Sequence, residues 1–374
     1  MKKIGYLIFA VFFSFFRLFP RKKNKVFCIM THDGSDGSSV GVVVQALKQR
    51  NEKYEFHYLK KAERESVKQH KLTQFLSFFL VKPYHLATSS VVMLDNVFLP
   101  MAYLKFAKDV KVVQLWHGTG TIKKFGQDVN TGELKELEKR ANSTITHLVV
   151  NSEYTKEQYS HAFGLEKSRI FSWGLPRTDE MFSEEITKKK TEHFYQKFPE
   201  LKDKKLVLYA PTFRDDEVNE PKLCLDLEKL MKETDSNTVY LLKLHPFVAA
   251  NFNIEGISSE RVKNVSFYQD INTLLMVSDV LITDYSSIIF EYCVLEKPMI
   301  FYAYDLEKFS KQGRGFYEPY KEYVPGPIAR TTEDIIQILN KNSYDFERIV
   351  LFKKKSYQYL DGQAINRLIK NIFE

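Results

Sequence analysis

The chain has 374 residues, which is more than one ordinary domain core needs and suits two domains of average size. Hydrophobic residues make up 44% of the chain and charged residues 27%, a globular balance that excludes a largely disordered protein. The formal net charge of +8 suits phosphorylated substrates, an anionic membrane face or nucleic acid. Because no known nucleic-acid module occurs in the sequence, we expect no nucleic-acid partner.

The three cysteines, Cys28, Cys224 and Cys293, are odd in number and far apart in the chain. Their spacing fits neither a disulfide framework nor a zinc site. No metal site and no cofactor are identified in the sequence, and the metal requirement of the protein stays open. Each cysteine lies in an apolar pattern typical of a buried small side chain. This usage is consistent with a reducing cytoplasm.

The N-terminus carries an uncharged run, residues 4–16, flanked by Lys2 and Lys3 on one side and by basic residues 17–23 on the other. This run is shorter than the ~20 residues that a membrane-spanning helix needs. Apolar side chains between basic flanks are typical of a helix that lies in the membrane interface. Residues 1–24 are therefore predicted to form a membrane-associating segment, with a first helix packed on the protein body as the alternative.

Short apolar runs then alternate with helical stretches, which predicts parallel sheets covered on both faces. The predicted strands are 25–30, 55–59, 91–94, 112–115 and 148–150 in the first half, and 206–210, 239–244, 265–268, 280–283 and 299–302 in the second. We expect an α/β fold of two Rossmann-like domains facing a cleft. The predicted bounds are 25–175 and 176–345, followed by a basic amphipathic helix over 346–374.

The carboxyl ends of parallel strands are where ligands bind, so polar residues directly after the predicted strands are candidate site residues. His117 follows the strand 112–115 within the sequence QLWHGTG, and Lys123 comes shortly after it. A histidine at this position can accept a proton from a substrate hydroxyl as a general base. A packed or surface histidine is the alternative.

Two further candidates follow strands of the second half. Thr212 and Arg214 leave one strand together, and a guanidinium there can hold a phosphate by two hydrogen bonds, or pair with a neighbouring acid. Lys243 and His245 alternate around Leu244, so we expect both to point to the same side of the strand. Two donor groups on one side suit a diphosphate and its departing nucleoside monophosphate.

The segment 283–287, sequence TDYSS, lies between a predicted strand and a helix. Ser286 and Ser287 can cap that helix, and the same hydroxyls and amides can bind an anion. Asp284 would repel a phosphate, so we expect it to bond a hydroxyl or to orient a basic neighbour. Arg314 lies in a predicted long connection and is a candidate phosphate ligand.

In this order, the motifs WHGTG, GLPRTD, YAPTFRDD, KLHP, ITDYSS and RGFY resemble the CDP-glycerol glycerophosphotransferase family, the teichoic acid glycerophosphate primases and polymerases. The resemblance covers roughly residues 90–330. It implies a GT-B-type arrangement with the donor between the two domains, and transfer of glycerol phosphate from CDP-glycerol with release of CMP. It also implies an undecaprenyl-diphosphate-linked saccharide as the acceptor, and a peripheral position on the cytoplasmic side of the cell membrane.

By the family pattern, His117 is the base that activates the acceptor hydroxyl, and His245 is a second catalytic histidine. Ser286, Ser287 and Arg314 would hold the donor phosphates. Lys123, Thr212, Arg214, Lys243 and Asp284 also match family positions, and we expect them to contact substrate. The sequence GTIKK after WHGT and the chain length favour the primase-like branch.

Three alternatives stay open. A CDP-ribitol or capsule-specific polyol-phosphate transferase would use the same motifs. A GT-B glycosyltransferase would use a nucleotide sugar and attack carbon rather than phosphorus, and fold analogy does not decide between these reactions. A catalytically silent membrane-bound scaffold would keep the fold but show no turnover.

Overall fold

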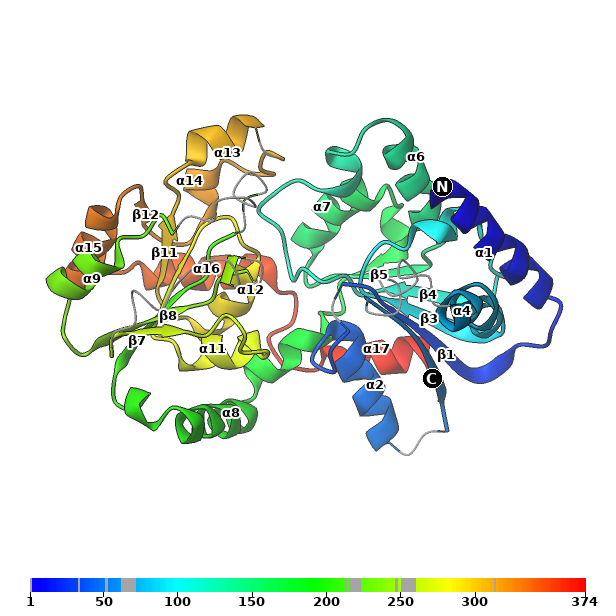
Figure 1. The fold of residues 1–374 in the computed structure, drawn as a ribbon, viewed down its shortest axis with the longest axis horizontal. Helices are drawn as coiled ribbons and strands as arrows, with labels where there is room; N and C mark the ends of the chain where they lie inside the picture. The colour runs from blue at the N-terminus through cyan, green and yellow to red at the C-terminus, as the bar shows by residue number, and fades with distance from the viewer. Residues whose placement is uncertain are drawn as a thin grey trace. The chain divides into compact units, whose positions relative to one another are not determined.

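The computed structural model describes residues 2–32, 34–50, 53–61, 72–212, 214, 223–245, 248–249, 260–312 and 314–374 (Figure 1). These residues form two compact units, each with its own sheet. Unit 1 comprises residues 1–120, 124–179 and 357–374, and unit 2 comprises residues 121–123 and 180–356. The α/β class with two parallel sheets is therefore confirmed, whereas the expected cleft between the domains stays a prediction.

Unit 1 is built on a parallel sheet with the strand order β2-β1-β3-β4-β5-β6. Its strands are β1 (Lys22–Met30), β2 (Glu55–Lys60), β3 (Ser89–Leu94), β4 (Lys111–Gln114), β5 (His147–Val149) and β6 (Ile170–Phe171). Successive β1 side chains alternate between two hydrophobic cores, because strand side chains point to opposite faces. Phe27 and Ile29 lie in one core, and Val26, Cys28 and Met30 in the other.

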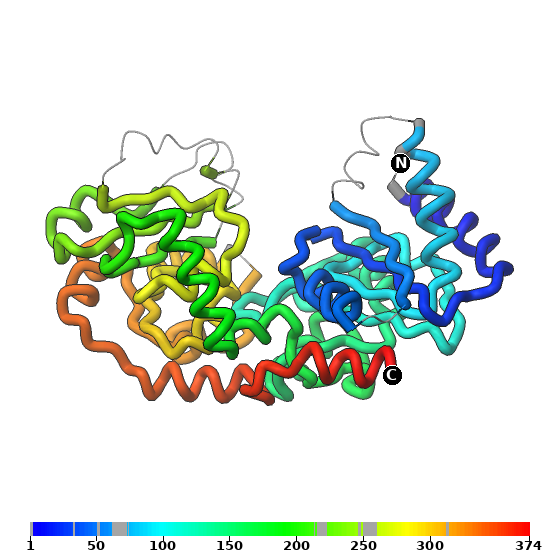
Figure 2. Tube along the Cα trace, turned by 90° about the horizontal axis from the view of Figure 1, so that it is seen from below, coloured from blue at the N-terminus to red at the C-terminus, as the bar shows by residue number. Residues whose placement is uncertain are grey.

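Helices cover both faces of this sheet, as its two apolar faces require. They are α1 (Lys2–Phe16), α2 (Ser39–Gln49), α4 (Leu72–Leu76), α5 (Lys82–Ala87), α6 (Gly132–Asn142), α7 (Glu153–Phe163) and α17 (Ala364–Ile372). The π-helical turn η2 (Ser77–Val81) joins α4 to α5, and the 3-10 turns are η3 (Leu99–Tyr103), η4 (Gly126–Asp128), η5 (Lys167–Arg169) and η6 (Pro176–Phe182). On one face α2 and α17 lie side by side, although they come from opposite ends of the chain (Figures 1 and 2).

Helix α1 packs against the other face of the unit 1 sheet. Phe9 and Phe13 are buried in the core on that face, and α1 contacts both η2 and α5. The opposite side of α1 exposes apolar side chains, among them Ile4 (62% exposed) and Val11 (67% exposed). Among the described residues, no helix is long and apolar enough to cross a membrane. The first helix thus packs on the body by one side, and its membrane association stays a prediction.

Unit 2 is built on a second parallel sheet with the strand order β12-β11-β10-β7-β8-β9. Its strands are β7 (Lys205–Tyr209), β8 (Thr238–Leu242), β9 (Val262–Asn264), β10 (Val280–Thr283), β11 (Met299–Tyr302) and β12 (Ile328–Ala329). Side chains of β7, β8, β10 and β11 fill its core. The strands expected at 280–283 and 299–302 coincide with β10 and β11.

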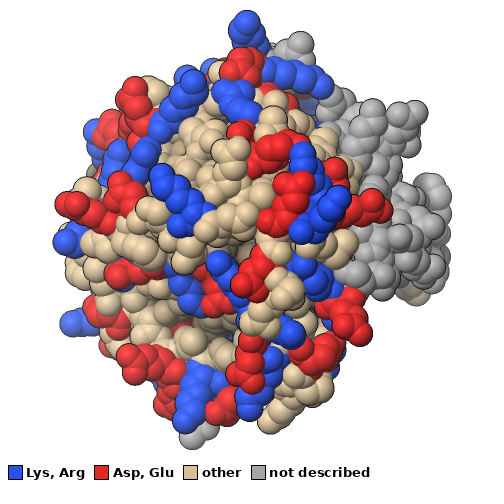
Figure 3. Space-filling view, turned by 90° about the vertical axis from the view of Figure 1, so that its left-hand side faces the viewer, with Lys and Arg blue, Asp and Glu red and all other residues tan. Residues whose placement is uncertain are grey.

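The helices of unit 2 are α8 (Glu184–Lys197), α9 (Leu227–Glu233), α11 (Ile271–Val277), α12 (Ile288–Tyr292), α13 (Leu306–Gln312), α14 (Tyr320–Tyr323), α15 (Thr332–Lys341) and α16 (Phe346–Ser356), with 3-10 turns η7 (Pro199–Leu201) and η10 (Cys293–Leu295). The face drawn in Figure 3 carries basic and acidic side chains close together. The excess positive charge is therefore not gathered into one field on this face.

Three expectations from the sequence need correction. The strand expected at 265–268 is a loop that follows β9, and its backbone carbonyls bond a lysine instead of a neighbouring strand. The connection expected after β11 contains the helices α13 and α14. The single helix expected over 346–374 is two helices, α16 and α17, because the chain turns at Gly362, whose φ is +61°.

Candidate active site

Three neighbouring strands of unit 1 deliver the polar residues around His117. His32 follows β1, Asp95 follows β3 and His117 follows β4. The rings of His32 and His117 stack with 3.7 Å between centroids and 4° between planes. The Asp95 carboxylate accepts hydrogen bonds from the backbone N–H groups of Thr31 (2.9 Å) and His32 (3.2 Å). Asp95 therefore fixes the segment that carries His32.

The backbone carbonyl of Asp95 also sets the tautomer of His117. His117 Nδ1 lies 3.0 Å from this oxygen, which can only accept, so Nδ1 carries the proton. The other ring nitrogen, Nε2, is then the basic one. Burial, then the neighbouring His32 and Arg177, lower the pKa of His117 to about 3, so its imidazole is neutral at pH 7. A neutral imidazole with a defined basic nitrogen is the form that a general base requires.

The backbone around His117 is held in an uncommon conformation. Trp116 has a φ of +53°, in the left-handed region that costs free energy for a non-glycine residue. Its indole ring stacks on Phe125 with a centroid distance of 5.4 Å. The Tyr159 hydroxyl donates to the carbonyl of Gly118 (2.9 Å), and Arg177 donates to the carbonyl of His117 (3.2 Å). These contacts fix the loop and compensate its strain.

In unit 2, Arg214 forms a buried ion network with two carboxylates. Its guanidinium lies 2.8 Å from Asp284 Oδ2 and 2.9 Å from Asp305 Oδ2, and its side chain is 6% exposed. Burial disfavours the charge, but the bonds to Asp305 and the charge of Asp284 outweigh burial and raise the pKa of Arg214. Arg214 pairs with Asp284 and Asp305, so its expected role as a phosphate ligand stays a prediction.

Asp284 orients its neighbours, which is one of the two roles expected from the sequence. Its Oδ1 accepts the backbone N–H groups of Thr212 (2.8 Å) and Tyr285 (2.6 Å). This carboxylate therefore joins the carboxyl ends of β7 and β10. Thr212 Oγ1 is buried, and it has no hydrogen-bond partner within the described part of the chain. A buried hydroxyl without a partner is available to a ligand.

Ser286 and Ser287 are half-buried hydroxyl residues between β10 and α12. The Ser286 hydroxyl accepts a weak bond from Ile288 N (3.4 Å), and Ser287 makes no side-chain cap. Helix α12 is only Ile288–Tyr292, so its dipole adds little to anion binding, and the expected role of the two hydroxyls stays a prediction.

Lys243 and His245 lie directly after β8 rather than on it. Lys243 Nζ donates to the carbonyls of Ser266 (2.8 Å) and Tyr268 (2.7 Å), and burial lowers the pKa of Lys243. This lysine holds the loop after β9. His245 is exposed to solvent, so it is accessible to a ligand.

Lys123 and Arg314 belong to the part of unit 2 near α13. Lys123 forms an isolated antiparallel bridge with Phe316, and its Nζ lies 5.9 Å from the Phe309 ring centroid. Arg314 is exposed beside Gly315, whose φ is +71°. The structure thus brings Thr212, Arg214 and Asp284 into direct contact, whereas Lys243 bonds to a different loop.

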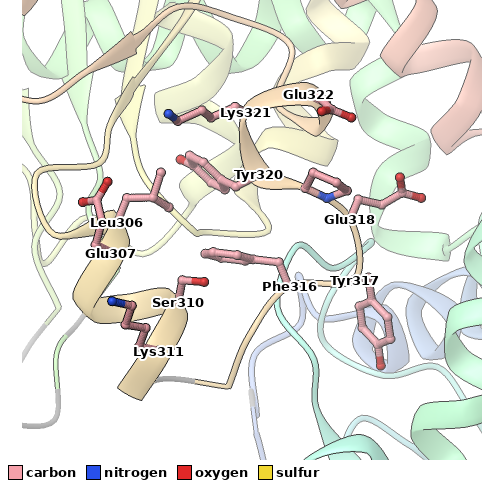
Figure 4. Close-up of a pocket in the computed structure, with 11 residues that line it drawn as sticks. Leu306, Glu307, Ser310, Lys311, Phe316, Tyr317, Glu318, Tyr320, Lys321 and Glu322 are labelled. Atoms are coloured by element: carbon pink, nitrogen blue, oxygen red, sulfur yellow. The ribbon is translucent and has the colours of Figure 1, made fainter.

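A cavity of about 630 Å³ lies beside this segment, between α13 and residues 316–322 (Figure 4). Phe316 and Tyr320 reach into it from one side and Ser310 from α13. The Tyr320 hydroxyl donates to the carbonyl of Asp284 (2.9 Å), which links the cavity wall to the ion network. Glutamate and lysine side chains complete the lining, so the cavity offers aromatic faces together with donors and acceptors, a combination that suits hydroxyl-bearing ligands.

Sequence reasoning missed His32, Asp95 and Asp305. All three follow a predicted strand, so the rule that sites form at strand ends could have found them. What it could not show is that the backbone oxygen of Asp95, and not its carboxylate, contacts His117. Among the described residues, the cluster of three metal-ligating side chains lies elsewhere in unit 1, at Glu55, His57 and His85.

Comparison with known proteins identifies the family. The chain belongs to the CDP-Glycerol:Poly(glycerophosphate) glycerophosphotransferase family, whose model matches residues 10–374. This membership confirms the resemblance seen in the motifs and makes the chain a member of a transferase family of teichoic acid synthesis.

Two curated relatives show the range of the family. The teichoic acid poly(ribitol-phosphate) polymerase of Bacillus spizizenii is 34% identical over 377 residues, covering 100% of this chain and 60% of the polymerase. The teichoic acid glycerol-phosphate primase of Bacillus subtilis is 34% identical over 295 residues, covering 77% of this chain and 74% of the primase. The chain therefore spans about three fifths of the length of the polymerase.

The fold is similar to that of the wall teichoic acid polymerase TagF. The TM-score is 0.80 with 25% sequence identity, covering 100% of this chain and 94% of the TagF chain. A TagF variant soaked with CDPG matches with a TM-score of 0.81 at 23% identity, covering 98% of this chain and 93% of that chain.

Proposed function

We propose that this protein transfers a polyol phosphate from a CDP-activated donor to a hydroxyl of a lipid-linked saccharide, releasing CMP. The observation that carries the proposal is the neutral, half-buried His117, whose Nδ1–H is held by the Asp95 carbonyl and whose Nε2 is left basic. Membership of the glycerophosphotransferase family supports the same reaction.

His117 Nε2 takes the proton of the acceptor hydroxyl as its oxygen attacks the phosphorus that bears the polyol. The new O–P bond forms while the bond from that phosphorus to the CMP oxygen breaks, and CMP leaves with the electron pair. The lowered pKa makes His117 a weak base in the free protein. A bound anionic donor within reach raises this pKa, because negative charge stabilises the imidazolium that forms.

Unit 2 supplies groups suited to the donor. The unpartnered hydroxyl of Thr212, the hydroxyls of Ser286 and Ser287 and the exposed His245 all follow strands of one sheet. Parallel strands present their carboxyl ends at one edge, so these groups can contact a diphosphate together. Exposed Arg314 adds a positive charge. The network of Arg214 keeps this edge rigid.

Two donors are candidates. CDP-glycerol is supported by the family motifs and by the name of the family, and TagF was soaked with CDPG. CDP-ribitol is the second candidate, because a ribitol-phosphate polymerase matches the whole of this chain. Addition of a single unit, as in a primase, is the outcome favoured by the sequence.

We also propose that unit 1 binds the cytoplasmic face of the cell membrane. The exposed side of α1 is apolar at Ile4, Val11 and Phe15, and the neighbouring η2 and α4 expose Val81 and Phe75. Basic residues flank α1 at both ends. Apolar side chains ringed by lysine and arginine suit an interface with anionic headgroups.

The reaction is tested by mixing the purified chain with a soluble analogue of a lipid-linked disaccharide and either CDP-glycerol or CDP-ribitol. CMP release and product mass identify the donor and the number of units added. We expect turnover with one CDP-polyol and none with nucleotide sugars. Turnover with nucleotide sugars alone, or no CMP release from either CDP-polyol, would contradict the proposal.

Membrane binding is tested by flotation with vesicles that contain anionic lipid. We expect the chain to float with these vesicles, and Val11→Glu to reduce the bound fraction. The control is Ile186→Glu, which places the same charge at an exposed apolar position of α8 in unit 2. Equal binding of both variants would contradict a role for α1.

A further inference from the structure

Three side chains with metal-ligating atoms converge at one edge of the unit 1 sheet. Glu55 and His57 are two residues apart on β2, so both point to the same face, and His85 comes from the last turn of α5. One ligand atom of each residue lies within 4.8 Å of the other two. His57 Nε2 is 2.6 Å from Glu55 Oε1, and the His57 and His85 rings stack at 3.5 Å.

This cluster lies away from the candidate active site. β2 is an edge strand of the sheet, and Glu55 is its first residue. In the parallel register Glu55 pairs with Lys25 and His57 with Phe27, upstream of the carboxyl end of β1 that leads to His32. The cluster therefore belongs to the opposite end of the strands, and nothing in the proposed transfer reaction uses it.

One nitrogen of the cluster is available to a ligand. His85 Nδ1 is buried and has no hydrogen-bond partner among the residues that the structure describes. Burying a polar atom without a partner costs free energy that a ligand would recover. Burial, then His57 and Lys25, lower the pKa of His85 to about 4, so its imidazole is neutral at pH 7.

Glu55 is likewise in its ligand form. Its hydrogen bond with His57, followed by that with Lys22, lowers the pKa of Glu55 to about 2. The carboxylate is therefore ionised at pH 7. Glu55 Oε1 and His57 Nε2 already face one another, so the two ligand atoms of β2 are turned toward the same point.

We propose that Glu55, His57 and His85 form a binding site for a divalent transition-metal ion such as Zn²⁺. Two histidines and one carboxylate, with water as the fourth ligand, are a donor set that Zn²⁺ accepts. Bonds of about 2.0–2.2 Å in tetrahedral geometry place ligand atoms roughly 3.3 Å apart. The His57 and His85 rings must turn out of their stacked arrangement for both lone pairs to point at one ion. The ion then replaces the Glu55–His57 contact and binds His85 Nδ1, which has no partner among the described residues.

Nearby lysines oppose a cation and limit its affinity. Lys22 Nζ lies 3.0 Å from Glu55 Oε2 and is 58% exposed, so it can move aside while Oε1 binds the ion. Lys25 is buried with Nζ bonded to Thr88 Oγ1 (2.8 Å), and Lys82 Nζ bonds the carbonyl of Tyr58 (2.6 Å). Removing the charge of Lys22 should therefore tighten metal binding.

A bound ion would join the edge strand β2 to α5, which packs against α1. The expected consequence is a more stable edge of unit 1, because a ligand that binds only the folded state stabilises it. This consequence does not depend on which reaction the protein catalyses.

The test is titration of the full chain with Zn²⁺ against a chromophoric chelator, together with Co²⁺ to report ligand geometry by visible absorption. We expect one Zn²⁺ per chain, a tetrahedral Co²⁺ spectrum and a melting temperature that rises with Zn²⁺. Glu55→Gln and His85→Ala should each weaken binding at least about tenfold. Lys22→Gln should strengthen it about threefold to tenfold.

The matched control is His161→Ala, which removes a histidine from the exposed His161–Glu157 pair on α7. This variant should bind Zn²⁺ as the parent chain does. Circular dichroism checks that each variant is folded, and Lys22→Gln tests the site even where a ligand variant does not fold. Two results would overturn the proposal. One is Zn²⁺ binding that does not saturate at one ion per chain. The other is an affinity that stays unchanged in folded Glu55→Gln and His85→Ala and in Lys22→Gln.

Discussion

The two sheets differ in the charge of the side chains at the carboxyl ends of their strands. In unit 1 this end holds a neutral histidine, His117, stacked on His32 and bonded to a backbone carbonyl. In unit 2 it holds a charged network in which Arg214 bridges Asp284 and Asp305. The same architecture thus holds a neutral imidazole in one unit and a buried charged network in the other. The strand ends thus determine where polar side chains gather. The hydrogen-bond and ion-pair partners of those side chains determine their charge and protonation.

The largest effect on activity is expected from removing the neutral histidine of unit 1. His117→Ala should lower kcat/KM about 10²- to 10⁴-fold, which is the usual contribution of a general base. CMP release with the preferred CDP-polyol measures the effect. His161→Ala, at an exposed histidine of α7, serves as the control and should keep full activity. Activity of His117→Ala within tenfold of the parent would remove the proton acceptor from the mechanism.

The contribution of the charged network of unit 2 to stability is tested by substituting Arg214. Arg214→Met leaves two carboxylates close together in a buried site, so we expect the free energy of unfolding to fall by about 3–5 kcal/mol. Urea denaturation measures this change. Arg330→Met breaks the exposed pair with Glu307 and should have a far smaller effect. A loss at Arg214 no larger than at Arg330 would show that the network does not support the fold.

In unit 1, the positioning role of Asp95 beside the two histidines is tested by substitution. Asp95→Ala removes the acceptor for the N–H groups of Thr31 and His32, so the stacked ring of His32 loses its anchor. We expect kcat to fall about 10- to 100-fold, as for other residues that orient catalytic groups. Asp95→Asn keeps one oxygen acceptor and should retain more activity.

The tautomer of His117, measured by ¹⁵N NMR, distinguishes a loss of positioning from general damage to the site. The backbone carbonyl of Asp95 remains in both variants, so Nδ1–H should persist while kcat falls. Equal kcat in Asp95→Ala and Asp95→Asn would contradict a role for the carboxylate.

The smallest expected effect is a pH dependence of stability. The folded-state pKa of His117, about 3, lies below its ordinary value of 6.5, so the folded chain binds fewer protons than the unfolded chain between these values. Stability is therefore unaffected by His117 above pH 6.5 and falls as pH is lowered towards 3, by up to about 1.4 kcal/mol per pH unit. Denaturation of the parent and His117→Asn at pH 7 and pH 5 should show a weaker pH dependence in the variant.

The strands were predictable because both sheets are parallel and buried on both faces, which leaves continuous apolar runs in the sequence. The strands at 280–283 and 299–302 were placed correctly. The two-residue strands β6 and β12 were missed because they are too short to leave a pattern. The strand expected at 265–268 was wrong because this segment is a loop whose carbonyls bond Lys243, with Val265 buried and Phe267 exposed.

The residues of the candidate site could be named from the sequence, whereas their contacts could not. The motifs named His117, Arg214 and Asp284, and the structure describes all three. The pairing of Arg214 with Asp305 joins positions 91 residues apart, so no local pattern could predict it. Lys243 bonds the loop after β9, which follows it by more than 20 residues, so no local pattern could predict this contact. The expected contact of Lys243 with substrate stays a prediction.

The α/β class, the family and the motif residues could be inferred from the chain alone, because these depend on local apolar patterns and on the order of short motifs. Only the tertiary structure decided that His117 is neutral with a basic Nε2, that Arg214 is held by two carboxylates, and that Glu55, His57 and His85 meet. The physical reason is that a side chain's charge and tautomer depend on burial and on partners that the fold brings from distant positions.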